Sequence, residues 1–256
     1  MLDLNHKSGF VYGRAADAPP PLGARINTLL DDALLAERAG QRPRDYLGAS
    51  RIGEPCARRL VYEFTRTPVD PGKEFAGRIL RIFEAGHVFE DLAIRWLRAA
   101  GFDLRTEKSG GGQFGFETAG GRIRGHVDGV IVGGPHLGLD WPVLWEHKAL
   151  KASSWSDTAK KGVQLSKPIY FGQMQIYMAY MGLGSALFTA LNKDSCELYH
   201  EHVPFDPVVA QALSDKAVDV LRAADAGELL PRLATSPDFF LCRFCPFAGR
   251  CWEGCA

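Results

Sequence analysis

One apolar segment that carries a charged pair constrains this chain more than any other feature. The segment "WPVLWEHKAL", residues 141–150, predicts a β-strand in which Glu146 and Lys148 share one face while His147 points to the other. The apolar residues around the pair indicate a central strand. Charges on such a strand are costly unless they are fully paired or serve a function. An ordinary salt bridge between Glu146 and Lys148 is the alternative.

A second carboxylate is expected beside this pair. Asp128 lies in "GHVDGVIV", which predicts the preceding strand, and a turn rich in glycine and proline joins the two. Adjacent antiparallel strands can place Asp128 next to Glu146. Carboxylate oxygens suit Mg²⁺ or Mn²⁺, and a lysine beside them can orient water or balance charge on a phosphate. The sequence therefore predicts a divalent metal site at Asp128 and Glu146, with Lys148 beside it.

Two predicted helices supply further candidates. In the helix expected over 77–101, His87 and Glu90 share one face, and a separate stripe is expected to face the core, formed by Val88, Leu92 and Trp96. His87 could equally be an ordinary histidine without a site role. In the helix expected from Pro168, Gln173 and Tyr177 are four residues apart and share a face. By themselves they are ordinary residues of an amphipathic helix.

The remaining segments indicate an α/β chain with helical ends. Residues 1–25 read as a flexible lead-in, and 26–256 as a single domain that begins with a helix ending at Gly40. Further predicted elements are a short helix from Pro55 that carries Cys56, antiparallel strands within 109–135, a hairpin over 185–203, and a helix from Asp206 to about Gly227.

Basic residues that could follow a phosphate backbone fall in two places. The segment 151–167 is expected to be a loop and carries Lys151, Lys160 and Lys161, while Arg58 and Arg59 follow the first cysteine. Trp155 in the loop could stack on an unpaired base or anchor the loop locally. Solvated charges are the alternative for each basic residue. Because 30 Lys and Arg balance 30 Asp and Glu, a nucleic-acid surface has to be a local patch.

Four of the six cysteines lie in the last fifteen residues. The spacing Cys242-x2-Cys245-x5-Cys251 suits ligands of one metal centre. Its fourth ligand could be Cys255, as in a four-cysteine zinc site, or the remote Cys56. The sixth cysteine, Cys196, is expected to be an inert buried thiol in a strand.

The chain has no apolar run long enough for a signal peptide or a membrane helix, so we expect a cytoplasmic protein without membrane contact. Reducing conditions in that compartment favour metal binding by clustered cysteines over disulfides.

The order of these motifs resembles that of the PD-(D/E)XK nuclease superfamily, in its RecB-like branch. The matching residues are Gly86-His87, Asp128, Glu146-His147-Lys148, and Gln173 with Tyr177; Val127 stands where the family often has proline. The resemblance implies a restriction-endonuclease-like core, a central mixed sheet flanked by helices.

It also implies a metal-dependent deoxyribonuclease. Mg²⁺ or Mn²⁺ would be held by His87, Asp128, Glu146 and the backbone carbonyl of His147. Lys148 would position the attacking water, with Gln173 and Tyr177 as supporting catalytic residues.

The cysteines resemble those of the iron-sulfur CRISPR-associated exonucleases and AddB-type nuclease domains. That likeness implies a [4Fe–4S] cluster held by Cys56, Cys242, Cys245 and Cys251, with Cys255 spare. It also implies an exonuclease acting on single-stranded DNA ends, with recombination or CRISPR adaptation proteins as possible partners, or a phage role. Two alternatives remain: a non-catalytic DNA-binding or assembly factor of the same fold, and a zinc-stapled structural protein.

Overall fold

The computed structural model describes residues 20–253, and its contacts divide the chain into two compact units. One unit comprises residues 1–42 and 76–80, and the other comprises 43–75 and 81–256. The first unit holds α1 (Leu22–Ala39), which ends at Gly40 as predicted. Residues 1–19 of the expected lead-in lie outside the described residues. The helix begins before residue 26 because nothing after Pro21 interrupts it.

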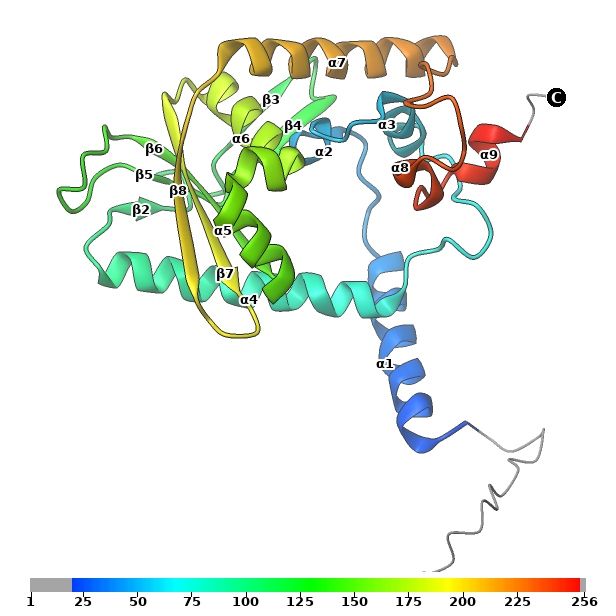
Figure 1. The fold of residues 1–256 in the computed structure, drawn as a ribbon, viewed down its shortest axis with the longest axis horizontal. Coiled ribbons are helices and arrows are strands. Elements are labelled where there is room, and N and C mark those ends of the chain that lie inside the picture. The colour runs from blue at the N-terminus through cyan, green and yellow to red at the C-terminus, as the bar shows by residue number, and fades with distance from the viewer. Residues whose placement is uncertain (1–19, 254–256) are drawn as a thin grey trace, which may run out of the picture. The chain divides into compact units, whose positions relative to one another are not determined.

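The larger sheet lies in the second unit (Figure 1). Within residues 20–253 it has five strands in the order β2 (Leu104–Arg105), β5 (Gly129–Ile131), β6 (Val143–Leu150), β7 (Ser185–Asn192) and β8 (Leu198–Pro204). The pair β6–β7 is parallel and the other pairs are antiparallel, so the sheet is mixed. As predicted, β6 is central and buried, and β7 and β8 form a hairpin. The restriction-endonuclease-like core is confirmed.

A smaller sheet has the order β1 (Leu47–Gly48), β4 (Ile123–His126) and β3 (Gly115–Thr118). The chain leaves this sheet after β4 and enters the larger one at β5, so Asp128 lies in the link between them. The prediction that Asp128 sits within a strand is therefore wrong. At this link the Asp128 side chain, rather than its backbone, bonds to β6: Oδ2 accepts a hydrogen bond from the His147 N–H.

Helices cover both faces of the larger sheet, α4 (Gly77–Ala99) on one face and α5 (Ala152–Ser166) and α6 (Pro168–Met181) on the other (Figure 1). The other helices of this part of the chain are α2 (Ala49–Ile52), α3 (Ala57–Phe64), α7 (Pro207–Ala226), α8 (Phe240–Arg243) and α9 (Ala248–Trp252). On one face, Ala93 of α4 packs in a core cluster with Trp145 and Leu187. On the other, Met174 and Ile176 of α6 belong to the main core. This arrangement places α6 directly over the charged pair of β6.

Two predicted helix starts lie at prolines. The predicted starts of α6 at Pro168 and of α7 at Pro207 are both confirmed. Asp206 caps α7: its Oδ1 accepts hydrogen bonds from the backbone N–H groups of Val208 at 2.9 Å and Val209 at 3.1 Å. The expected helix at Pro55 begins two residues later, at Ala57. Cys56 therefore occupies the extended N-cap position rather than the helix.

The segment 151–167 was expected to be a loop and is mostly helix α5, interrupted at Gly162, whose φ of 76° is left-handed. The prediction was wrong because it relied on the polar composition of this segment. Two of the segment's apolar residues, Trp155 and Val163, pack into the core and hold the helix in place. Trp155 packs against the main core, and its indole Nε1 donates to the Ala190 carbonyl at 3.0 Å. Trp155 is thus a local anchor.

The expected core stripe of α4 is also wrong. Val88 is 59% exposed and Trp96 is 39% exposed, whereas Ala93 is buried and Leu97 packs beside it. This helix has apolar residues on several faces, so its periodicity does not single out one stripe. The small side chain of Ala93 lets the helix approach the sheet closely.

Cys196 was expected to be buried in a strand, but it is exposed and lies in the turn before β8. Its φ of 62° and its N–H bond to the Asn192 carbonyl at 2.7 Å close that turn.

Across residues 20–253, none of the helices combines the length and the apolar character needed to cross a membrane.

Candidate functional site

The predicted carboxylates and lysine meet where β5 and β6 pair. Gly129 is opposite Trp145, which brings the preceding Asp128 alongside β6. Asp128 Oδ2 accepts a hydrogen bond from the His147 N–H at 2.8 Å and lies 3.6 Å from Lys148 Nζ. Lys148 Nζ also donates to Glu146 Oε1 and, at 2.8 Å, to the His147 carbonyl. The expected proximity of Asp128, Glu146 and Lys148 is confirmed.

Helix α6 places two predicted residues against this group. Gln173 Nε2 donates to Glu146 Oε1 at 2.7 Å and lies 3.3 Å from the Tyr177 hydroxyl oxygen. Gly125 on β4 permits this packing, because a Cβ there would come within 2.6 Å of the Tyr177 ring. Tyr170 was missed: Lys148 Nζ lies over its ring, 5.5 Å from the centroid. Its spacing of three from Gln173 could have indicated it.

Helix α4 contributes Glu90, which the sequence interpretation did not assign to the site. Burial, followed by the negative charge of Asp128, raises the pKa of Glu90 to about 7, while Lys148 acts in the opposite direction. His87, the residue predicted as a ligand, has an 80% exposed side chain, and its Nδ1 lies 3.9 Å from Glu90 Oε2. Glu90 shares a helix face with Ala93 and Leu97, a signal obscured by the wrong core stripe.

Glu146 is the most constrained group of the site. Its side chain is fully buried, and burial, then repulsion from Asp128, raises its pKa against the opposing effect of Lys148. Oε1 is held by Gln173 and Lys148, whereas Oε2 is buried without a hydrogen-bond partner among the described residues. A buried carboxylate oxygen of this kind calls for a cation or a proton.

Lys148 and Tyr177 keep their protons. Burial lowers the pKa of Lys148, but the charges of Asp128 and Glu146 outweigh it, so the net pKa is raised and the side chain is an ammonium ion. Burial, followed by the charge of Glu146, raises the pKa of Tyr177, so its phenol remains a hydrogen-bond donor.

The His147 ring points away from this group. Its Nδ1 lies 2.8 Å from Thr189 Oγ1. Burial lowers the pKa of His147 to about 4, so the imidazole is neutral. Its ligation through the backbone carbonyl, like that of His87, stays a prediction.

The donor set fits a hard divalent cation in kind. Glu90, Asp128 and Glu146 offer carboxylate oxygens, and one of these is buried without a partner. Within residues 20–253, no three His, Cys, Asp or Glu side chains stand in a ready-made ligand arrangement. In this structure the Lys148 ammonium balances the negative charge instead.

The second predicted centre is a cavity lined by four thiols, those of Cys56, Cys242, Cys245 and Cys251. The thiols are close enough to interact electrostatically. Burial raises the pKa of the Cys242 thiol, and the negative charges of Cys56 and Cys251 raise it further. The cavity therefore brings a residue from before the central sheet together with the tail. Cys255 lies outside the described residues.

In donor type and number these four thiols are those that a [4Fe–4S] cluster requires, but among residues 20–253 they do not stand in a ready-made ligand arrangement either. The other lining includes the apolar residues Leu233, Leu241 and Trp252. The Asp70 carboxylate fixes this wall by accepting from the Gly249 N–H, at 2.6 Å, at the start of α9.

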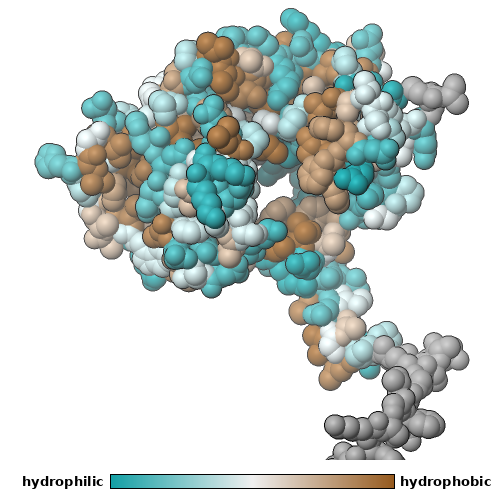
Figure 2. All heavy atoms as spheres, in the orientation of Figure 1, coloured by the Kyte–Doolittle hydropathy of each residue, from teal (hydrophilic) through white to brown (hydrophobic). Residues whose placement is uncertain are grey.

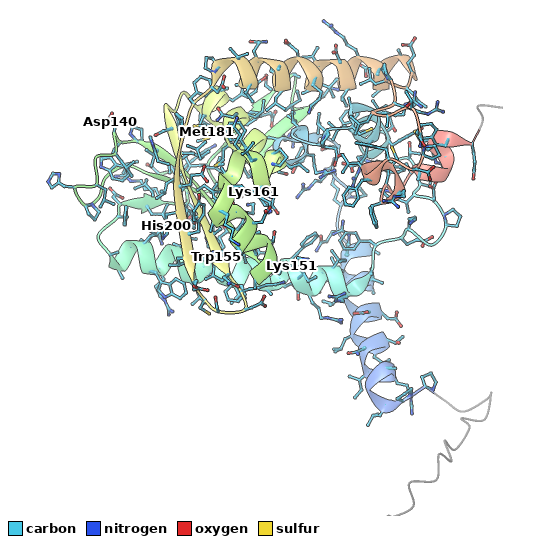
Figure 3. All side chains as sticks on the ribbon, in the orientation of Figure 1. Asp140, Lys151, Trp155, Lys161, Met181 and His200 are labelled. Carbon is cyan, nitrogen blue, oxygen red and sulfur yellow. The ribbon has the colours of Figure 1, made fainter. Side chains whose placement is uncertain are left out.

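The basic residues differ in availability. Arg58 Nη1 lies 3.8 Å from Cys251 Sγ. Arg59 lines the four-thiol cavity and pairs with Glu54 and Glu63. On α5, Lys160 is exposed and Lys161, also exposed, pairs with Asp157 at 2.6 Å, while the exposed Lys151 is the N-cap residue that precedes the helix. Figure 3 labels Lys151 and Lys161 along α5. The α5 lysines are thus more accessible than the two arginines.

No family model matches this chain, and no curated protein matches its sequence. Its fold is similar to the crystal structure of an alkaline exonuclease (LHK-Exo) from Laribacter hongkongensis, with a TM-score of 0.51 and 16% identity over 77% of this chain and 93% of that chain. The structure of LHK-Exo in complex with dAMP matches with a TM-score of 0.50, at the same identity and coverage. The chain thus shares the fold of these exonuclease structures.

Proposed function

We propose that this chain is a divalent-metal-dependent DNA exonuclease of the PD-(D/E)XK superfamily, in its RecB-like branch. The observation that carries the proposal is the fully buried Glu146 on the central strand, with one oxygen unpartnered among the described residues and with Asp128 and Lys148 beside it. The similarity of the fold to that of an alkaline exonuclease supports DNA as the substrate.

Each residue then has a distinct task. Glu90, Asp128 and Glu146 would hold Mg²⁺ or Mn²⁺, which when bound supplies an acidified water and neutralises charge on the phosphate. Gln173 holds Glu146 Oε1, which leaves Oε2 as the oxygen without a hydrogen-bond partner among the described residues. The Lys148 ammonium orients the attacking water and stabilises negative charge as it develops on the phosphate. Tyr177 supports Gln173 from the next turn of α6. His87 and the His147 carbonyl are further candidate ligands.

The four-thiol cavity supports a second part of the proposal, a structural [4Fe–4S] cluster held by Cys56, Cys242, Cys245 and Cys251. The cluster would link the segment before α3 to the tail. We assign it a structural role because its ligands are distinct from the residues of the carboxylate site. Zinc in the same pocket is the competing occupant, and metal analysis with visible absorption separates the two.

The test is cleavage of end-labelled single-stranded and double-stranded DNA by anaerobically purified protein with Mn²⁺. Glu146→Gln should abolish cleavage, because it removes the charge while keeping the shape of the side chain. Glu117→Gln is the matched control, since Glu117 is an exposed glutamate on β3. Cleavage at the wild-type rate by Glu146→Gln would refute the site.

A further inference from the structure

Exposed aromatic side chains gather at α8. Phe239 is 45% exposed, Phe240 61% and Phe244 69%. The rings of Phe240 and Phe244 meet edge to face, with centroids 5.1 Å apart. Neither of these two rings lines the four-thiol cavity, whose apolar wall includes Leu241 instead. Large rings that build neither a core nor a pocket indicate a contact surface.

The surroundings of this aromatic pair are basic. Arg243, on the same helix, is exposed. Figure 2 shows hydrophobic side chains gathered over α8 on one side of a hollow, with hydrophilic side chains over α5 on the other side. Helix α5 carries the exposed Lys160, and Lys151 precedes its first turn. A surface with rings on one wall and ammonium groups on the other matches a polyanion that has flat apolar faces.

We propose that Phe240 and Phe244 stack on the bases of single-stranded DNA whose phosphates run along the lysines of α5. The inference rests on the proposed nuclease function and specifies its substrate as an unpaired strand. In a duplex the faces of the bases are stacked on one another, whereas an unpaired strand exposes them to aromatic rings. An apolar protein partner would match the rings, but not the lysines of the opposite wall.

The test measures binding separately from cleavage. A fluorescein-labelled oligothymidylate is titrated with the full chain in EDTA, and anisotropy reports the affinity. The double variant Phe240→Ala/Phe244→Ala should bind at least about tenfold more weakly, since each stacked base contributes measurably to affinity. Phe240→Trp/Phe244→Trp should retain binding, because indole also stacks. Phe240→Leu/Phe244→Leu should bind nearly as weakly as the alanine pair, because leucine keeps the apolar area and lacks an aromatic face.

Two controls complete the design. Trp96→Ala removes an exposed ring of α4 and should leave the affinity for the oligothymidylate unchanged. Thermal melting and visible absorption confirm that each variant keeps its fold and pocket. Lys151→Ala/Lys160→Ala should reduce the salt dependence of binding, with a loss of about 0.7 in the logarithmic slope for each phosphate contact removed.

The proposal is overturned if the alanine pair binds the oligothymidylate like the wild type, or if the leucine pair restores binding, which would indicate a simple apolar contact. Its failure is distinguishable from failure of the nuclease function. Glu146→Gln should lose cleavage and keep single-strand binding. The alanine pair should lose single-strand affinity in EDTA, where no cleavage takes place.

Discussion

The position of Glu90 among carboxylates makes the stability of the metal-free protein depend on pH in a specific direction. The pKa of Glu90 rises from an ordinary 4.5 to about 7 in the folded chain. Below pH 4.5 both the folded and the unfolded chain keep Glu90 protonated, so Glu90 does not change the free energy of unfolding. As pH rises, the unfolded chain releases the proton first, and the folded state becomes relatively less stable until pH exceeds about 7.

The size of this loss in stability follows from the difference between the folded and unfolded pKa values of Glu90. At about 1.36 kcal/mol for each pKa unit, the full cost is on the order of 3 kcal/mol, and most of it develops between about pH 5 and pH 8. Glutamine at this position is neutral throughout. The unfolding free energy of Glu90→Gln should therefore gain roughly 2–3 kcal/mol relative to wild type when pH is raised from 5 to 8.

Urea unfolding in EDTA at the two pH values measures this gain. Glu117→Gln, which changes an exposed carboxylate, should show no comparable pH-dependent gain over wild type. A difference between Glu90→Gln and wild type that stays constant within about 0.5 kcal/mol would show that Glu90 is not held among the carboxylates. Added Mn²⁺ at pH 8 should reduce the advantage of Glu90→Gln, since a cation stabilises the ionised wild-type site.

Two further predictions concern the remaining chemistry. Lys148→Ala should slow single-turnover cleavage on the order of 100-fold while DNA binding persists, because it removes a charge that acts on the transition state; a loss under about tenfold would contradict that role. Cys56→Ala should lose visible absorption and melt at a lower temperature, whereas Cys196→Ala, in an exposed turn, should do neither; full iron content in Cys56→Ala would exclude it as a ligand.

The part of the site that could be predicted is the part set by local geometry. Alternation along a strand places Glu146 and Lys148 on one face, and helical spacing aligns Gln173 with Tyr177. These relations depend only on the local strand or helix geometry and not on how the element packs. In the structure, hydrogen bonds link all four residues in one group.

The missed features depend on tertiary packing. Glu90 joins the site because α4 turns Ala93, rather than Val88, toward the sheet, and the apolar pattern of this helix permits several orientations. Helix α5 was missed because its stability comes from Trp155 anchored on β7, a contact distant in sequence. Periodicity cannot supply either fact, because each is decided by a neighbouring element.

The cysteine pocket and the carboxylate site are connected through one close backbone contact. Cys56 lies three residues after Gly53, whose missing side chain lets α6 approach, since a Cβ there would lie 2.7 Å from the Ile169 carbonyl oxygen. The same helix carries Gln173, which holds Glu146 Oε1. A group that binds the thiol of Cys56 therefore restrains the segment on which α6 rests. Through that contact, the proposed centre at Cys56 would restrain the position of Gln173 and, with it, the orientation of the buried Glu146 carboxylate.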